Sequence, residues 1–262
     1  MKRIVITGST RGIGLSMAKE FLKHGCKVTI TGRAPIASPE LITELKPYEG
    51  RYQYVPCNVR VFSELEALWE AATKHWGGID IWVNNAGQNV PHEFCYHTEA
   101  SYVDAVIDTN IKGVIYGSQI AAKQMLIQGH GQIWNMEGLG SNDMIQVKTI
   151  LYGTTKRALT YFTKGLAREL KETPVMAGLL SPGMVLTEFM TKTPEGEISP
   201  VLQNKSFQFI FNNLGDRPET VASFFIPRIL ANRKNNSHIV WLTNAKSFYR
   251  MMRSPFMRRR LL

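Results

Sequence analysis

The sequence is poor in cysteine and contains no long apolar run. Its three cysteines, Cys26, Cys57 and Cys95, are odd in number and widely spaced, which argues against a disulfide framework and favours reduced thiols. No stretch approaches the roughly 20 consecutive apolar residues that a membrane-spanning helix needs. The apolar segment Ile4–Ile6 follows the N-terminus so closely that we expect no cleavable presequence. These absences predict a cytoplasmic protein.

Acidic residues are also scarce, since 31 lysines and arginines stand against 21 aspartates and glutamates, for a formal net charge of +10. More than half of this excess lies in residues 246–262, a basic C-terminal tail without any acidic residue. A nucleic-acid-binding protein needs both a basic surface and an element that reads the nucleic acid. The sequence shows no such element, and we predict that nucleic acid is not a partner.

The basic tail also carries large apolar side chains. This composition is typical of a segment that lies on an anionic membrane, and it predicts peripheral membrane contact. An exposed tail or a subunit-contact arm explains the same composition, and Pro255 interrupts any helix there. The cations are Lys246, Arg250, Arg253, Arg258, Arg259 and Arg260, and the apolar residues are Phe248, Tyr249, Met251, Met252, Phe256, Leu261 and Leu262.

Linkers, internal repeats and low-complexity tracts are absent, so residues 1–245 are expected to form one domain. Short β-branched runs alternate with helix-length segments whose apolar residues are spaced by three and four. This alternation predicts an α/β domain of the Rossmann type, a doubly wound parallel sheet with helices on both faces. The predicted strands are Arg3–Thr7, Lys27–Thr31, Tyr52–Pro56, Ile79–Val83, Gln132–Met136, Val175–Leu180 and His238–Leu242. The predicted helices are Ile13–His24, Ser63–Trp76, Glu99–Gln128, Ile150–Glu172 and Glu219–Ala231.

The first predicted strand leads into a glycine-rich loop. Residues Thr7–Gly14 read TGSTRGIG and open the first predicted helix. Glycines in this context permit a tight turn and a close backbone approach to a pyrophosphate, and the helix N-terminus offers N–H donors. A plain tight turn is the alternative. The residues predicted to contact a dinucleotide here are Gly8, Ser9, Thr10, Arg11, Gly12, Ile13 and Gly14.

The end of the second predicted strand bears on the choice of cofactor. An acid there would accept hydrogen bonds from the ribose 2′-hydroxyl of NAD, whereas a cation favours the 2′-phosphate of NADP. The strand ends on Thr31-Gly32-Arg33 without a nearby acid, and Arg11 adds a second cation. We therefore predict NADP(H) in preference to NAD(H). The alternative is that both arginines are merely solvated.

Four features, in this order and spacing, resemble the short-chain dehydrogenase/reductase family. They are the glycine-rich loop, the NNAG segment Asn84–Gly87, Asn110 within a predicted helix, and the pattern Tyr152-x-x-x-Lys156. Each feature is weak alone, but together they extend over roughly residues 1–245. The resemblance implies an NAD(P)-dependent oxidoreductase that interconverts alcohols and carbonyls. We expect a homo-oligomer and no metal ion.

The resemblance also implies further contacts with the cofactor. Asn58 and Val59 would lie at its adenine end, although the family more often has an acid in place of Asn58. The NNAG segment would line the cofactor, and the segment Ser181–Thr187 would lie at its nicotinamide end. The residues implied in these two segments are Asn85, Ala86, Gly87, Pro182, Gly183, Val185 and Thr187.

Carbonyl reduction requires a proton donor for the developing alkoxide, and the helix Ile150–Glu172 carries a candidate. Tyr152 and Lys156 are four residues apart, so they share one side of the helix. An ammonium beside a phenol lowers the pKa of the phenol. The resemblance implies that Tyr152 gives the proton, Lys156 assists Tyr152 and holds the cofactor ribose, and Asn110 anchors a water in a proton relay.

A serine that orients the carbonyl is missing from its usual place. In the family it follows the fifth strand, and counting along Gln132–Met136 puts Gly138 at that position. The nearest hydroxyl is Ser141, which lies eleven residues before Tyr152 on a loop with two glycines. Either Ser141 replaces the usual serine, or the site lacks this donor.

Five longer segments resemble the chlorophyll b reductase branch of the family. They are NMEGLGS at 135–141, YGTTK at 152–156, SPGMVLTEF at 181–189, IDIWVNNAG at 79–87 and RPETVASFFIPRIL at 217–230. The plant enzymes of this branch carry a transit peptide, which this chain is expected to lack. The resemblance implies the reaction class, and its implication for the substrate is looser.

Residues 184–215 are expected to form a lid over the substrate. They are rich in Met184, Phe189, Met190, Phe207, Phe209, Ile210 and Phe211. These side chains predict a bulky hydrophobic substrate with a formyl or keto group, although they could equally pack the lid onto the body. Two other functions stay open: a generic ketoreductase for acyl, steroid-like or polyketide carbonyls, and a non-catalytic protein that senses NADP(H).

Overall fold

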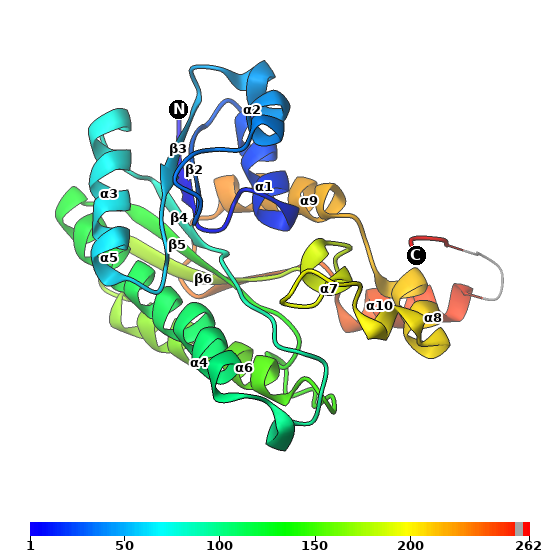
Figure 1. The fold of residues 1–262 in the computed structure, drawn as a ribbon. Coiled ribbons are helices and arrows are strands. Elements are labelled where there is room, and N and C mark those ends of the chain that lie inside the picture. Colours follow the sequence, from blue (N-terminus) through cyan, green and yellow to red (C-terminus); the bar gives the residue numbers. More distant parts are fainter. Residues whose placement is uncertain (255–258) are drawn as a thin grey trace.

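Seven strands form one sheet in the order β3-β2-β1-β4-β5-β6-β7, and every neighbouring pair is parallel (Figure 1). The computed structural model describes residues 1–254 and 259–262. From β1 the chain adds strands first toward β3 and then, after crossing over, toward β7, so the sheet is doubly wound. The strands are β1 (Arg3–Ile6), β2 (Lys27–Gly32), β3 (Tyr52–Pro56), β4 (Ile81–Asn84), β5 (Gly131–Met136), β6 (Val175–Ser181) and β7 (Ser237–Val240).

Helices cover both faces of this sheet (Figure 1). One face packs against α1 and α9, and the other packs against α3, α5 and α6. The helices are α1 (Gly12–Lys23), α2 (Pro39–Leu45), α3 (Phe62–Trp76), α4 (Ala100–Ile107), α5 (Gly113–Gln128), α6 (Ile150–Glu169), α7 (Glu188–Thr191), α8 (Lys205–Leu214), α9 (Pro218–Ala231) and α10 (Asn244–Arg253).

The two apolar cores follow from the alternation of side chains along each strand. In β1, Ile4 and Ile6 point into the core under α1 and α9, whereas Val5 points into the core under α3 and α5. Successive side chains of a strand lie on opposite faces, so a central strand needs apolar residues at every position. The continuous run Ile4–Ile6 meets this requirement, and burying it on both faces fixes β1 at the centre of the sheet.

The structure confirms the predicted fold class and all seven predicted strands, whose ends shift by no more than two residues. The prediction of one uninterrupted helix over Glu99–Gln128 is wrong. The helix begins at Ala100, and a π-helical turn, Asp108–Lys112, separates α4 from α5. Short helices α2, α7, α8 and α10 were not predicted.

The π-helical turn lies where α5 comes closest to the chain after β3. A Cβ on Gly113, the first residue of α5, would lie 2.9 Å from Val59 Cγ2 and 3.0 Å from the Val59 carbonyl oxygen. The close contact leaves no room for a side chain at Gly113. Single π turns inside α-helices occur frequently at functional sites, and this one contains Asn110.

The C-terminal tail is attached to the segment that was predicted to be a lid. In Figure 1, α10 lies beside α8, and the two helices are in contact. The buried carboxylate of Asp216 accepts hydrogen bonds from Trp241 Nε1 at 2.7 Å, from Arg250 at 2.6 Å and from Arg259 at 2.8 Å. Two of the tail's cations therefore point inward as structural ion pairs.

Other parts of the tail remain exposed. Phe248, Tyr249 and Met252 of α10 present apolar surface to solvent. Membrane contact through this surface stays a prediction, and Pro255, Phe256 and Arg258 lie outside the described residues. Among the described helices, none is long and apolar enough to span a bilayer.

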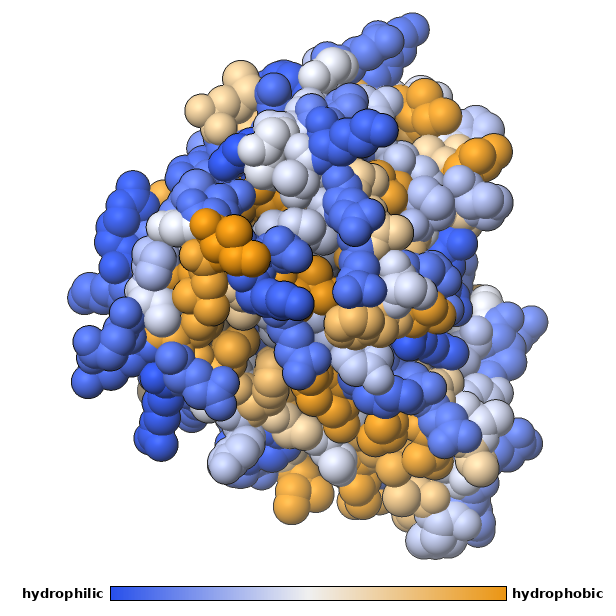
Figure 2. Space-filling model, turned by 90° about the vertical axis from the view of Figure 1, so that its left-hand side faces the viewer, coloured by the Kyte–Doolittle hydropathy of each residue, from blue (hydrophilic) through white to orange (hydrophobic). Residues whose placement is uncertain are grey.

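Apolar side chains also gather on the face that carries α3 and α5. Figure 2 shows this face with mainly hydrophilic side chains above and more apolar surface below, at the height of α4 and α6 in Figure 1. Ile127 in α5 and Tyr161 in α6 are among the exposed apolar residues of these helices. Large apolar patches often mark contacts between proteins. The expected homo-oligomer would cover such surface, and it stays a prediction.

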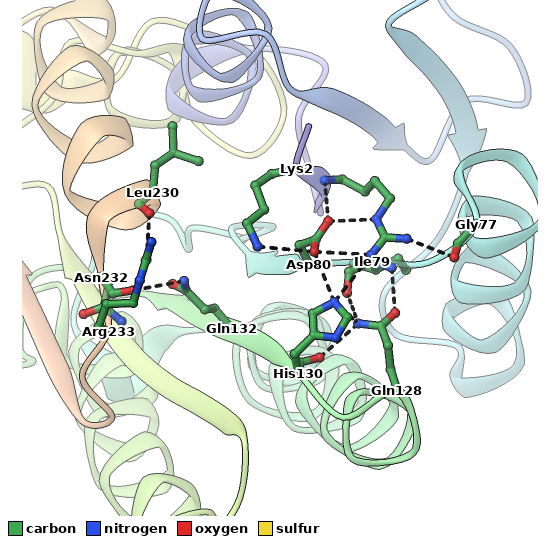
Figure 3. A network of polar contacts seen from close by, with 11 residues as sticks. Lys2, Gly77, Ile79, Asp80, Gln128, His130, Gln132, Leu230, Asn232 and Arg233 are labelled. Carbon is green, nitrogen blue, oxygen red and sulfur yellow. Dashed lines mark hydrogen bonds and ion pairs between the residues drawn. The ribbon is translucent and has the colours of Figure 1, made fainter.

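A polar network holds the amino ends of β1, β4 and β5 together (Figure 3). The Asp80 carboxylate, only 8% exposed, accepts hydrogen bonds from the Arg3 side chain at 2.7 Å and the Arg3 backbone N–H at 2.8 Å. Lys2 and His130 lie 3.4 and 3.2 Å from the same carboxylate. Burial alone would raise the pKa of Asp80, but the hydrogen bonds from Arg3 and the charges of Arg3 and Lys2 lower it to about 2.

The network predicts a stability that depends on Asp80. A carboxyl whose pKa falls from 3.8 to about 2 on folding stabilises the folded state by about 2 kcal/mol above pH 4. This contribution disappears as the pH falls from about 4 to about 2. We expect Asp80→Asn to lower the free energy of unfolding at pH 7 by about that amount, measured by urea denaturation. Glu44→Gln, which removes an exposed ion pair with Lys19, is the control and should cost less than about 1 kcal/mol.

Candidate active site

The carboxyl ends of β1, β4, β5 and β6 meet at one edge of the sheet (Figure 1). Ligands of open parallel sheets bind at this edge, next to the strand where the order reverses. The glycine-rich loop follows β1, the NNAG segment ends β4, Glu137–Ser141 follow β5, and Pro182–Thr187 follow β6. The predicted site segments are therefore neighbours in space.

Hydrogen bonds fasten the glycine-rich loop to the end of β4. The Asn85 amide nitrogen donates to the Thr7 and Gly8 carbonyls at 3.0 and 2.9 Å. In return, the Thr7 hydroxyl oxygen accepts from the backbone N–H groups of Asn85 and Ala86, each at 3.0 Å. A Cβ on Gly8, whose φ is +62°, would lie 2.8 Å from Ala86 Cα. Hydrogen bonds from Asn85 and the close contact with Ala86 thus hold the glycine-rich loop in its conformation.

The loop and the start of α1 suit a bound pyrophosphate. Gly12 begins α1, its φ is +58°, and no side chain caps the helix N-terminus. The first turn of α1 holds no acidic residue, so its N–H donors and positive dipole end are available to an anion. Ser9 is turned inward, because its hydroxyl donates to the Ile6 carbonyl at 2.7 Å and accepts from the Thr31 N–H at 3.0 Å. Ser9 therefore supports the loop from inside.

The segment after β6 lies against the same loop. A Cβ on Gly12 would lie 3.4 Å from Thr187 Cγ2, which is ordinary van der Waals contact. Gly183 adopts a φ of +69° and packs on Leu242, and Val185 pairs with Asp216. Pro182 and Val185 are buried. The structure brings the segment predicted for the nicotinamide end next to the segment predicted for the pyrophosphate.

The two arginines predicted to select the cofactor differ in their surroundings. Arg33 follows β2 and is exposed, whereas Arg11 forms an ion pair with Glu188 of α7 at 2.9 Å. Thr10 packs against Gly32, where a Cβ would lie 2.6 Å from Thr10 Cγ2. Arg11 is therefore already paired with an acid, and selection of the cofactor by either arginine stays a prediction.

The residues predicted at the adenine end are only partly accessible. Val59 is buried, and its neighbour Asn58 uses its backbone N–H to donate to Glu64 at 2.7 Å. The Asn58 side-chain oxygen accepts from the Arg60 N–H at 3.2 Å. Ile13 packs its side chain onto the core beneath α1. Contacts of these residues with a cofactor stay predictions.

Tyr152 and Lys156 of α6 lie close to Asn110 of the π-helical turn. Lys156 Nζ donates to the Met136 carbonyl at 2.9 Å and lies 5.7 Å from the centre of the Tyr152 ring. The Asn110 amide donates to the Gln88 carbonyl at 3.0 Å and to Thr155 Oγ1 at 3.1 Å. Its oxygen accepts from the Gln88 N–H at 2.8 Å. Both polar atoms of the Asn110 side chain are therefore engaged within the protein, and a relay water at Asn110 stays a prediction.

Burial dominates the charge states at this site. It raises the pKa of Tyr152, which is the opposite of the direction predicted from the neighbouring ammonium. The reason is that the Lys156 ammonium points to the Met136 carbonyl and is itself buried. Burial lowers the pKa of Lys156 to about 8, and the negative charge of Glu137 opposes this shift.

These elements match a known group of enzymes. A protein-family model described as short chain dehydrogenase matches residues 2–198. The chain belongs to the short-chain dehydrogenase/reductase family. It is therefore an NAD(P)-dependent oxidoreductase that acts on CH–OH and C=O groups.

Individual relatives narrow the placement within the family. The chain is 34% identical over 259 residues to chlorophyll(ide) b reductase NOL, chloroplastic, of Oryza sativa subsp. japonica, covering 95% of this chain and 73% of that protein. The closed form of serine dehydrogenase complexed with NADP⁺ is similar with a TM-score of 0.79 and 25% identity, covering 92% of this chain and 95% of that one. ElxO with NADP bound gives 0.78 and 27%, covering 91% and 96%. The resemblance to the chlorophyll b reductase branch is thereby confirmed.

This short-chain dehydrogenase/reductase has a glycine, Gly138, facing its tyrosine. A Cβ on Gly138 would overlap the Tyr152 hydroxyl, so the hydroxyl fills the space that a side chain at position 138 would need. The Ser141 hydroxyl does not point to Tyr152. It accepts a hydrogen bond from the Gly138 N–H at 3.2 Å. Its carbonyl accepts from Arg157 at 3.1 Å. The structure turns Ser141 toward its own loop, and its catalytic role stays a prediction.

Two residues at this site were not predicted from the sequence. Glu137 is buried at the end of β5, next to Met136, whose carbonyl accepts from Lys156. Gln88 bonds to the Asn110 side chain through its backbone N–H and carbonyl. The sequence signal for Glu137 was an acidic residue directly after a predicted strand. A loop residue at such a position is ordinarily solvated, so this signal did not predict burial. Gln88 contributes only backbone groups, so its side-chain type carried no signal.

The contact between Gly138 and Tyr152 predicts an unusual result. Gly138→Ser would supply the hydroxyl that the family usually has, yet its Cβ would displace the Tyr152 hydroxyl. We expect turnover to fall, on the order of 10²-fold or more, because small displacements of reacting groups are costly. Ser141→Ala is the matched comparison and should cost much less, since its hydroxyl already serves the loop. Steady-state kinetics decide, and a gain of activity in Gly138→Ser would contradict this geometry.

Proposed function

We propose that this enzyme uses NADPH to reduce a formyl or keto group on a bulky hydrophobic substrate. The observation that carries the proposal is the convergence of Tyr152, Lys156 and Asn110 at the edge where the glycine-rich loop begins α1. The similarity to chlorophyll(ide) b reductase NOL supports reduction of a carbonyl. A tetrapyrrole-like molecule is the leading substrate class.

The residues of this chain divide the work of the reaction. When bound, the cofactor supplies the hydride. Tyr152 donates its phenolic proton to the carbonyl oxygen, and the Lys156 ammonium favours this transfer by stabilising the phenolate that remains. The fixed Asn110 then provides the route by which Tyr152 regains a proton. Gly8, Gly12 and the start of α1 would hold the pyrophosphate.

Apolar groups beside Tyr152 support a hydrophobic substrate. The ring of Phe189 lies 5.6 Å from the ring of Tyr152, and Phe189 is partly exposed. By contrast, Phe211 is fully buried and stacks on Phe207, its neighbour one turn earlier on α8. Among the apolar residues predicted for the lid, Phe189 is therefore the best placed to meet a substrate, whereas Phe211 packs inside the protein.

A panel of aldehydes and ketones tests the reaction. We expect NADPH oxidation with bulky apolar aldehydes, measured as the loss of absorbance of the reduced nicotinamide. Tyr152→Phe keeps the ring and removes the hydroxyl, so turnover should fall by about 10²- to 10⁴-fold while NADPH binding persists. Cofactor binding without turnover of any carbonyl would favour the alternative, a protein that senses NADP(H). Preference for acyl or steroid-like ketones would favour a generic ketoreductase.

We also propose that NADP(H) is preferred over NAD(H), because Arg33 is exposed after β2 and no acid stands there. Arg33→Asp replaces a partner of the 2′-phosphate by a repelling charge. The expected loss of NADPH affinity is about tenfold or more, with NADH affinity held or improved. Arg11→Gln is the matched control and should have a smaller effect, because Arg11 already pairs with Glu188. Equal affinities for both cofactors in the unaltered protein would overturn the preference.

A further inference from the structure

The side of α6 that faces the sheet is polar where a packed helix is usually apolar. Lys156, Thr160 and Thr163 are spaced by four and three residues, and all three are buried. Below them, Asn135 of β5 donates to Thr163 Oγ1 at 2.9 Å. Polar groups buried in this way must find partners, so the sheet beneath α6 has to supply them.

Glu137 supplies the charged partner in this stripe. It is 3% exposed, and its Oε1 accepts from the Thr160 hydroxyl at 2.8 Å. Thr160 lies one helical turn after Lys156, which is itself 4% exposed. Lys156 in turn donates to the carbonyl of Met136, the residue next to Glu137. A buried carboxylate and a buried ammonium are therefore held by adjacent backbone positions at the end of β5.

The second carboxylate oxygen of Glu137 reaches across the sheet to β7. Glu137 Oε2 lies 2.7 Å from His238 Nε2, and the His238 side chain is 46% exposed. His238 lines a groove of about 440 Å³ between α9 and β7, together with Phe224 and Arg228. Solvent in this groove reaches one side of the imidazole, while its other side contacts the buried acid.

The electrostatic consequence concerns Lys156. An isolated ammonium in this environment would lose its proton readily, because removal from water penalises the charged form. The titratable groups around it are Tyr152 on the same helix, Glu137 after β5 and, through Glu137, His238 on β7. Thr155, the neighbour of Lys156 on α6, and Asn110 of the π-helical turn, which donates to Thr155, are uncharged. Glu137 is therefore the source of negative charge that favours the ammonium.

We infer that Glu137 is a positioning residue of the active site, whose carboxylate at the end of β5 keeps Lys156 charged, and that His238 holds the Glu137 carboxylate in that position. The inference rests on the proposed function, in which the Lys156 ammonium holds the cofactor and assists Tyr152. Glu137 touches neither substrate nor cofactor in this arrangement. Its effect passes through Lys156.

Binding of NADPH as a function of pH tests this role. Fluorescence of the reduced nicotinamide gives the dissociation constant from about pH 6 to about pH 9, on either side of the Lys156 titration. In the unaltered protein, binding should weaken as the ammonium is lost near pH 8. In Glu137→Gln, loss of the negative charge lowers the pKa of Lys156 further, so the same weakening should occur about one pH unit or more lower.

Three further variants separate charge from packing. Glu137→Asp retains the carboxylate and should restore most of the normal pH dependence. Thr160→Val removes a hydrogen bond to Glu137 but keeps the charge, so its curve should follow the unaltered protein. If Glu137→Gln alone does not fold, Glu137→Gln with His238→Gln replaces the pair by two amides that can bond to each other, and the same shift is expected.

The outcomes distinguish this inference from the proposed function. If Glu137→Gln binds NADPH with an unshifted pH dependence while carbonyls are still reduced, the inference is wrong and the function stands. If Glu137→Gln, Glu137→Asp and Thr160→Val weaken binding equally at every pH, Glu137 serves packing alone, which also overturns the inference. If the shift occurs but the unaltered protein reduces no carbonyl, the role of Glu137 stands and the proposed reaction fails.

Discussion

Two charged side chains, Glu137 and Lys156, are buried at the carboxyl end of β5, and the cost of removing them from water constrains everything around them. A buried charge is tolerated only when it is paired and hydrogen-bonded. Thr160 and His238 meet this need for Glu137, and the Met136 carbonyl meets it for Lys156. Because these partners come from β5, α6 and β7, the site cannot form before the sheet and its covering helix have assembled.

The same constraint recurs where the lid joins the body. Burial would raise the pKa of Asp216, but hydrogen bonds from Arg250, Trp241 and Arg259 hold it below its usual range. The backbone of Asp216 also pairs with the chain after β6, accepting from the Leu186 N–H and donating to the Met184 carbonyl, each at 2.9 Å. Asp216 thus connects the tail, through its carboxylate, to the segment beside the glycine-rich loop, through its backbone. The tail's basic composition is explained in part by this demand for cations inside the structure.

Much of the fold could be predicted from the sequence because local patterns determine it. The continuous apolar run Ile4–Ile6 predicts a strand buried on both faces, and the glycine-rich loop directly after it favours a turn into a helix, as the structure shows. The π-helical turn could not be predicted, since it accompanies the contact between Gly113 and Val59, which are far apart in the sequence. The helices α8 and α10 were not predicted, because each is short and gains stability from contact with the other.

In the candidate site too, only the features determined by local sequence could be predicted. Tyr152 and Lys156 share a helix face whatever the tertiary structure, so their spacing sufficed. The partnership of Glu137 and His238 joins residues 101 positions apart, and no local pattern announces it. The direction of Ser141 depends on a loop in which Gly140 and Asp143 both adopt positive φ angles, of 97° and 65°. Such a path is selected by the packing of the whole loop.

The glycine at position 138 links these observations. It lets the Tyr152 hydroxyl lie against the end of β5, in the space that a side chain would otherwise fill. In the proposed reaction, with the Ser141 hydroxyl bonded to the Gly138 N–H, Tyr152 would both polarise and protonate the carbonyl. The acidity of its phenol would then matter more than in a site with a second donor. Burial raises the pKa of that phenol, and a charged Lys156, 5.7 Å from the ring centre, would oppose the rise. A buried carboxylate one residue from the missing side chain, which favours the charged form of Lys156, suits such a site.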